Sequence, residues 1–166
     1  MGRVVSQDEL ILRRSELKRN GKSVVFASGR FDLLHPGHTR LLEQSRANGD
    51  VLIVAIENDK NAGLQREHEP VQKPRRPITP AAERAEIIAA LAAVDYVIEF
   101  ESATAHDLIK RLAPDVVVKG GEPGSDEAAF RDDEAATAAG SKVVRIPLEP
   151  GHSTARLIER IKTIRA

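Results

Sequence analysis

The sequence predicts an α/β fold: a doubly wound, mainly parallel five-stranded sheet with helices on both faces. Apolar runs rich in β-branched residues alternate along the chain with stretches of helical composition, the pattern of parallel strands joined by helices. The runs are continuous, as in Val-Leu-Ile-Val-Ala-Ile at 51–56, which is typical of strands covered on both faces. The length of 166 residues fits a single domain over 1–166.

Five short apolar segments are the predicted strands. We expect the crossovers between them to be right-handed, because nearly all parallel crossovers are. The predicted strands are Val24–Ala27, Val51–Ile56, Tyr96–Phe100, Asp115–Lys119 and Val143–Ile146.

Capping residues and prolines place the helices. Ser6 and Glu9 have the spacing of a capping box, so an N-terminal helix is expected within residues 1–21. Thr79-Pro80 sets a cap residue before a proline at the first helical position of a helix over Ala81–Ala93. Further helices are predicted from Pro36 or Gly37 to Asn48-Gly49 and over Thr104–Leu112, Glu127–Ala139 and Ser153–Ile164. The proline-containing, charged segment 61–77 is expected to be a mobile surface loop.

The composition excludes several classes of protein. The chain has 25 basic and 25 acidic residues, and this zero net charge argues against a nucleic-acid partner. The absence of cysteine from the sequence excludes a thiolate nucleophile, an iron–sulfur cluster and a disulfide framework. The charged N-terminus has no signal-peptide core, and no apolar run approaches the roughly 20 residues that span a bilayer. We therefore expect a cytoplasmic protein without a membrane partner.

The turn after the first predicted strand, Ser28–His38, carries the strongest functional pattern. In folds of this class ligands bind at the carboxyl ends of the strands. His35 and His38 are spaced i and i+3, so they share a face in the first turn of a helix. Gly37 allows a ligand close to the backbone, and a helix N-terminus is a natural phosphate site. The pattern indicates phosphate chemistry; the alternative is a chance spacing at a helix that Pro36 starts.

Residues 29–38, Gly-Arg-Phe-Asp-Leu-Leu-His-Pro-Gly-His, resemble the Gly-x-Phe-Asp-x-x-His-x-Gly-His signature of the cytidylyltransferase-like nucleotidyltransferases. Other segments resemble one branch, the D-glycero-β-D-manno-heptose 1-phosphate adenylyltransferases, which occur alone or as the C-terminal half of a bifunctional heptose kinase–adenylyltransferase. The similarity covers most of residues 4–164. The segments are Arg76–Pro80, Glu83–Glu86, Ala93–Val97, Pro114–Gly121 and Pro150–Thr154.

The resemblance implies a Rossmann-like fold and an enzyme in which a substrate phosphate oxygen attacks the α-phosphorus of ATP, with Mg²⁺ as cofactor. It implies that His35 and His38 stabilise the α-phosphate and that Lys119 acts with them. The implied nucleotide-binding residues are Ser28, Gly29, Arg30, Phe31, Asp32, Gly37, Gly120, Gly121, Ser153 and Thr154, and the implied substrate-binding residues are Asp59, Arg84 and Glu122.

For several of these residues the sequence leaves a structural role open. Asp32 either orients the turn, helps to hold magnesium or caps a helix. Ser153 and Thr154 either cap the last helix or bind phosphate. Lys119 could be a solvated lysine at a turn, and Arg84 a solvated or ion-paired arginine. The metal ligands are not identified.

The sequence also departs from the family pattern. Ala155 stands where a second Thr is common, and Glu122 stands where Asp is usual, which affects one hydroxyl contact to the nucleotide and one contact to the sugar. The loop before Arg76 is longer than in the family. Its candidate substrate-contacting cations are Lys60, Arg66, Lys73 and Arg75.

The leading hypothesis is adenylyl transfer from ATP to heptose 1-phosphate, giving ADP-heptose and pyrophosphate for lipopolysaccharide core synthesis. The length leads us to expect a stand-alone adenylyltransferase whose sugar 1-phosphate comes from a separate sugar kinase, and a homodimer is possible. One alternative is a cytidylyltransferase that uses CTP and glycerol 3-phosphate or another small phosphate ester. The other is a non-catalytic nucleotide-binding domain, against which the two histidines and Lys119 argue together.

Overall fold

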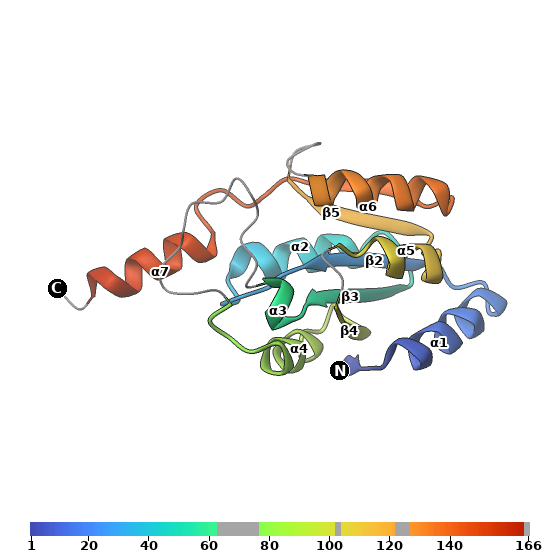
Figure 1. Ribbon diagram of the computed structural model, residues 1–166, viewed down its shortest axis with the longest axis horizontal. Coiled ribbons are helices and arrows are strands. Elements are labelled where there is room, and N and C mark those ends of the chain that lie inside the picture. Colours follow the sequence, from blue (N-terminus) through green and yellow to red (C-terminus); the bar gives the residue numbers. More distant parts are fainter. Residues whose placement is uncertain (63–76, 102–103, 122–126, 165–166) are drawn as a thin grey trace.

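The computed structural model describes residues 1–62, 77–101, 104–121 and 127–164, and its central feature is one six-stranded sheet (Figure 1). Every strand pair that it describes is parallel, in the order β1-β4-β3-β2-β5-β6. The predicted α/β fold is therefore confirmed. The strands are β1 Arg3–Val4, β2 Val24–Gly29, β3 Val51–Glu57, β4 Tyr96–Phe100, β5 Val116–Gly120 and β6 Lys142–Ile146.

The predicted count of five strands omits β1. This strand has two residues, both exposed, and pairs Arg3 with Tyr96 and Val4 with Val97 at the edge of the sheet. The Gly2 N–H donates to the Ala89 carbonyl over 2.8 Å, which fixes the N-terminus against the end of a helix. A two-residue edge strand has no apolar run of its own, so hydrophobic periodicity does not reveal it.

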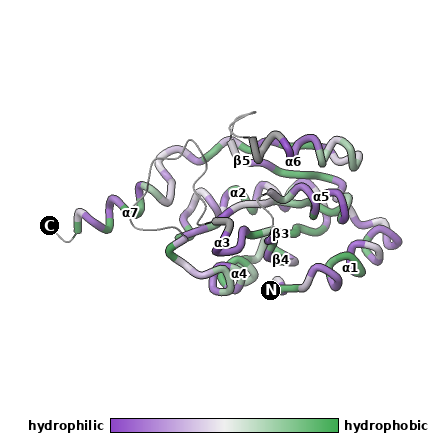
Figure 2. Tube along the Cα trace, in the orientation of Figure 1, coloured by the Kyte–Doolittle hydropathy of each residue, from purple (hydrophilic) through white to green (hydrophobic). Residues whose placement is uncertain are grey.

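Helices cover both faces of the sheet, as predicted. On one face α1, α5 and α6 enclose a core that includes Val24 and Phe26, and on the other α2 and α4 enclose a core that includes Val25 and Ala27. Because successive strand side chains point to opposite faces, a strand buried twice must be apolar at every position. Figure 2 shows this as hydrophobic colour along the strands and mixed colour along the helices. The helices are α1 Gln7–Arg19, α2 Pro36–Arg46, α3 Asp59–Ala62, α4 Ala81–Ala89, α5 His106–Leu112, α6 Glu127–Ala138 and α7 Thr154–Thr163.

The predicted helix ends agree with the structure to within a few residues. Ser6 caps α1 by accepting the Glu9 N–H over 3.2 Å, which is one of the two hydrogen bonds of the predicted capping box. The N-cap of α4 is Pro80 rather than Thr79, and α4 ends at Ala89 rather than Ala93. Among the helices of the described residues, none is long and apolar enough to cross a membrane.

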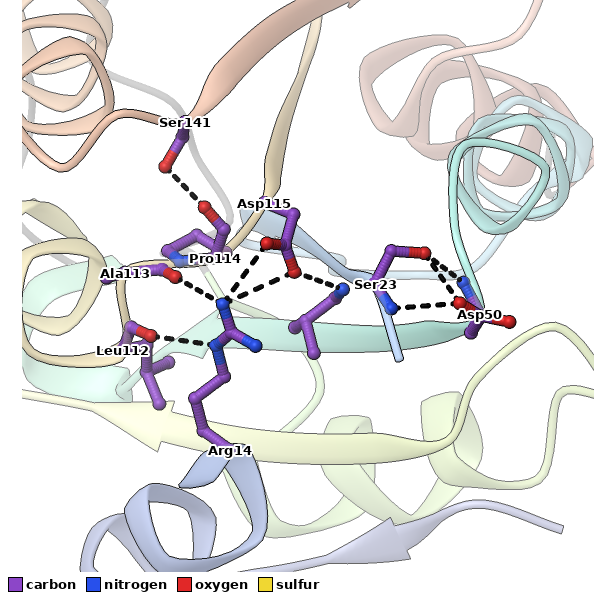
Figure 3. A network of polar contacts seen from close by, with 9 residues as sticks. Arg14, Ser23, Asp50, Leu112, Ala113, Pro114, Asp115 and Ser141 are labelled. Atoms are coloured by element: carbon purple, nitrogen blue, oxygen red, sulfur yellow. Dashed lines mark hydrogen bonds and ion pairs between the residues drawn. The ribbon is translucent and has the colours of Figure 1, made fainter. Parts of the chain in front are cut away.

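The amino edge of the sheet is held by a buried arginine. Arg14 on α1 donates from Nε to the Leu112 carbonyl over 3.1 Å and from Nη2 to the Ala113 carbonyl over 2.8 Å (Figure 3). Its Nη2 also pairs with Asp115, whose Oδ2 accepts the Val24 N–H over 2.7 Å. These contacts join α1, α5, β2 and the start of β5, so the polar groups at this edge serve the fold.

Candidate active site

The carboxyl edge of the sheet has a topological switch point between β2 and β5. From β2 the chain passes through α2 to β3 on one side, whereas β5, the other neighbour of β2, is reached later through α5. α2 and α5 lie on opposite faces of the sheet. Ligands of doubly wound folds bind outside the carboxyl ends of the strands at such a point. The segments that follow β2 and β5 are therefore the first place to look for a site.

The turn after β2 is strained and is held by one buried carboxylate. Phe31 and Leu33 both have φ of 49°, a left-handed conformation that costs bulky residues about 1–3 kcal/mol each. Asp32 between them is 2% exposed, and its carboxylate accepts the N–H groups of Ile78 and Thr79 over 3.0–3.1 Å. The contacts of Asp32 therefore fit the predicted orienting role: they tie the strained turn to the segment before α4.

The turn delivers two histidines to the start of α2. The rings of His35 and His38 are stacked with centroids 3.8 Å apart and planes 19° apart, and Phe31 meets His38 edge-on at 5.4 Å. Both Nδ1 atoms are buried and have no hydrogen-bond partner within the described ranges. A Cβ on Gly37 would lie 3.0 Å from the His35 ring and 3.4 Å from the Cβ of His152, so glycine makes room for this packing.

Burial keeps both imidazoles neutral at neutral pH. The pKa of His38 is lowered to about 4, first by burial and then by His35, with Asp32 opposing the shift. The pKa of His35 is also lowered, first by burial and then by His152, with its own backbone opposing the shift. A neutral imidazole donates one N–H and accepts at its other nitrogen. An arriving phosphate favours the protonated form, because a nearby anion stabilises the cation. The pair can therefore both donate to a phosphate and take up a proton.

Lys119 approaches the switch point from the other face of the sheet. Its ammonium forms an ion pair with Asp132 on α6 and lies 3.4 Å from the Ser28 Oγ on β2. Lys119 is 8% exposed, so the alternative of a solvated lysine does not hold. Asp132 was not among the predicted site residues. Its signal in the sequence is an acidic residue three and four positions before the buried Ala135 and Ala136, on the inward face of a helix.

Arg84 lies beneath the site and binds the protein itself. It is 2% exposed and donates to the carbonyls of Thr79, Arg30 and Glu57 and to the Asp59 carboxylate. These contacts match the structural alternative for Arg84. Asp59 is 52% exposed in its side chain and remains accessible beside this cluster.

The remaining predicted site residues lie at the start of α7 or are glycines in turns. Ser153 caps α7 by accepting the Arg156 N–H over 3.2 Å, and the Thr154 Oγ1 donates to the Asp32 carbonyl over 2.9 Å. Gly121 has φ of +91°, and a Cβ on Gly120 would lie 3.2 Å from Leu148. A Cβ on Gly29 would likewise lie 3.1 Å from the ring of Phe31. Glu122 and most of the predicted loop 61–77, with Arg66, Lys73 and Arg75, lie outside the described residues.

Comparison with known proteins decides the family. The family model described as cytidylyltransferase-like matches residues 26–160, which contain the histidine turn, Lys119 and the start of α7. The chain belongs to the cytidylyltransferase-like family. It is a nucleotidyltransferase enzyme, as the family model over residues 26–160 indicates.

The curated relatives of this family member are longer proteins. The bifunctional protein HldE of Ectopseudomonas mendocina is 39% identical over 159 residues, covering 96% of this chain and 32% of that protein. HldE of Syntrophotalea carbinolica is 40% identical over 144 residues, covering 87% and 28%. The chain thus spans about a third of the length of the first of these relatives. A lipopolysaccharide core biosynthesis protein from Thermoplasma volcanium has a solved structure with a TM-score of 0.58 and 26% identity, covering 78% of this chain and 98% of that one.

The carboxylates that the structure describes at the site do not form a metal centre on their own. No group of three or more histidine or acidic side chains with metal-binding geometry occurs in the described part of the chain. The Asp32 carboxylate, the one candidate ligand named from the sequence, is directed at two backbone N–H groups. Mg²⁺ is usually held by one or two carboxylates together with substrate phosphates and water. A magnesium ion that arrives with the triphosphate fits these residues better than one that the protein holds alone.

Proposed function

We propose that this nucleotidyltransferase moves AMP from ATP to D-glycero-β-D-manno-heptose 1-phosphate, giving ADP-heptose and pyrophosphate. The observation that carries the proposal is the stacked, neutral pair His35 and His38 at the N-terminus of α2, beside the switch point. The choice of substrates is supported by the HldE relatives and by the lipopolysaccharide core biosynthesis protein with a similar fold.

In the proposed reaction the protein positions the reactants and stabilises charge. A phosphate oxygen of the sugar phosphate attacks the α-phosphorus, the bond from that phosphorus to the oxygen bridging to the β-phosphate breaks, and pyrophosphate leaves. The substrate brings its own nucleophile, so no protein side chain needs to be activated for attack. The catalytic groups are then hydrogen-bond donors directed at oxygens whose charge grows in the transition state.

The described residues supply such donors from both faces of the sheet. His35 and His38 offer ring N–H groups at the first turn of α2, where backbone N–H groups and the helix dipole also favour an anion. Lys119 offers an ammonium from β5. In this scheme Ser28, Gly29, Arg30, Phe31, Gly37, Gly120, Gly121, Ser153 and Thr154 form the nucleotide-binding side, and Asp59 and Glu122 the acceptor side. Asp32 and Arg84 hold the turn in place.

The wider setting follows from the proposed substrates. Mg²⁺ enters as part of the MgATP substrate. A sugar kinase must produce the 1-phosphate, and both reactions belong in the cytoplasm, where ATP is available. A homodimer remains a prediction.

The test is pyrophosphate release by the purified protein with ATP or CTP and a panel of phosphate esters. We expect turnover with ATP and heptose 1-phosphate. We also expect a loss of at least about tenfold in kcat for His38→Ala, which is a lower bound because one lost transition-state donor typically costs about 10²–10³-fold. Preference for CTP with glycerol 3-phosphate would replace the proposed substrates. Nucleotide binding without turnover on any ester would identify a non-catalytic domain. Full activity of His38→Ala would remove His38 from the mechanism.

A further inference from the structure

Lys119 and Asp132 form a buried ion pair next to the proposed nucleotide site. Their side chains are 9% and 7% exposed, and they come from adjoining elements, β5 and α6. The pair lies on the α6 face of the sheet, because Val117, two residues before Lys119, packs into the core of that face with Ala135 and Ala136. The ammonium extends along this face to the Ser28 Oγ at 3.4 Å, on the other strand of the switch point.

The ion pair also restrains the position of the Lys119 ammonium. A lysine side chain has a flexible four-carbon stem and about 2 kcal/mol of rotamer entropy, so its ammonium is poorly placed unless another group restrains it. Asp132 supplies that restraint through Oδ2, and a position on a packed helix supports the carboxylate itself. The Oδ1 atom of Asp132 is buried and has no hydrogen-bond partner among the described residues. The hydrogen-bond partner that the structure describes for this carboxylate is therefore Lys119.

We infer that Asp132 is a positioning residue for nucleotidyl transfer: it holds the Lys119 ammonium at the carboxyl end of β2, directed at the ligand phosphates, and balances its charge until they arrive. The rate measurements that test this inference depend on the proposed function. Asp132 does not contact the reacting atoms. It acts only through Lys119.

The charges around Asp132 come from three elements. Burial raises the pKa of the Asp132 carboxyl, while Lys119 on β5 and His106 on α5 oppose the shift and the adjacent Asp133 adds to it. Asp133 has its own partner, Arg145 on β6. Asp133→Asn is therefore a matched control: it removes a neighbouring helical carboxylate in another ion pair and leaves the Lys119 pair intact.

Kinetics of four variants test the inference. Asp132→Asn keeps the shape of the side chain and removes its charge, and we expect a fall of about tenfold in kcat with a smaller change in KM for ATP. Asp133→Asn should stay within about twofold of the wild type. In a Lys119→Met background, Asp132→Asn should cause no further loss, because residues that act through one another are not additive. Additive losses, or equal losses from Asp132→Asn and Asp133→Asn, would overturn the inference.

A second readout separates this inference from the proposed function. With carbon-13-labelled lysine, the Lys119 Cε signal can be followed by NMR without any substrate. Asp132→Asn removes the carboxylate that restrains the ammonium, so the Lys119 signal should shift and sharpen in Asp132→Asn and stay unchanged in Asp133→Asn. A wild type that releases no pyrophosphate refutes the function but leaves this change expected. An unchanged Lys119 signal in Asp132→Asn refutes the inference even if turnover is found.

Discussion

Arg84 gives the sharpest test of how the site is supported. Replacement by alanine removes four hydrogen bonds and leaves the carbonyls of Thr79, Arg30 and Glu57 without this donor. At about 1 kcal/mol net for each bond, the expected loss of unfolding free energy is about 4 kcal/mol. For a chain of this size that corresponds to a fall of roughly 8–16 °C in Tm. Arg84→Lys keeps the charge but not the fork of donors, so it should recover only part of the loss.

The assay is thermal unfolding of each variant, paired with KM measurements for ATP and for the sugar phosphate below the new Tm. Glu86→Ala, an exposed position on the same helix, is the control and should leave Tm within about 2 °C. We expect a large fall in Tm for Arg84→Ala with a change of less than about threefold in either KM. A nearly unchanged Tm with a tenfold higher KM would show that Arg84 contacts the substrate.

Three further predictions address other parts of the chain. Gly37→Ala places a Cβ 3.0 Å from the His35 ring, so kcat should fall about tenfold or more while Tm is unchanged or higher; full activity would refute the packing argument. The pKa of His38 is about 4 in the free protein and rises beside phosphate, so ATP binding near pH 6 should take up protons. Calorimetry in two buffers should show less proton uptake for His38→Asn than for the wild type. Equal uptake would exclude His38 as the group that is protonated. Ala113→Gly relieves a φ of 42° and should stabilise the fold by about 0.5–1 kcal/mol in urea titrations, whereas a loss of stability would mean that the left-handed turn is not strained.

The fold was largely predictable because its strands are buried on both faces. Val51–Ile56 is apolar at every position, and only a strand between two helix layers needs that. β1 could not be found in this way, since its two exposed residues gain their place from pairing with β4. The N-cap of α4 is also set by distant contacts, because Asp32 takes up the Thr79 N–H.

The sequence predicts those parts of the candidate site that depend on residues close together in the chain. It does not predict contacts between residues that are far apart in the sequence. The i, i+3 spacing brings His35 and His38 together within one helical turn, and the structure stacks them. The partner of Lys119 lies in another element, and nothing in the spacing selects Asp132 over Asp133 except which side of α6 each one faces. For the same reason the sequence did not show that Arg84 donates into the protein rather than toward a ligand.

Attack at the α-phosphorus of ATP can be tested directly by following a radioactive phosphorus label. The wild-type protein is incubated with heptose 1-phosphate and ATP labelled at either the α- or the γ-phosphate, and the products are separated. We expect the α-label to enter the sugar nucleotide and the γ-label to leave as pyrophosphate. A γ-label on the sugar, or no α-label in any sugar product, would contradict it.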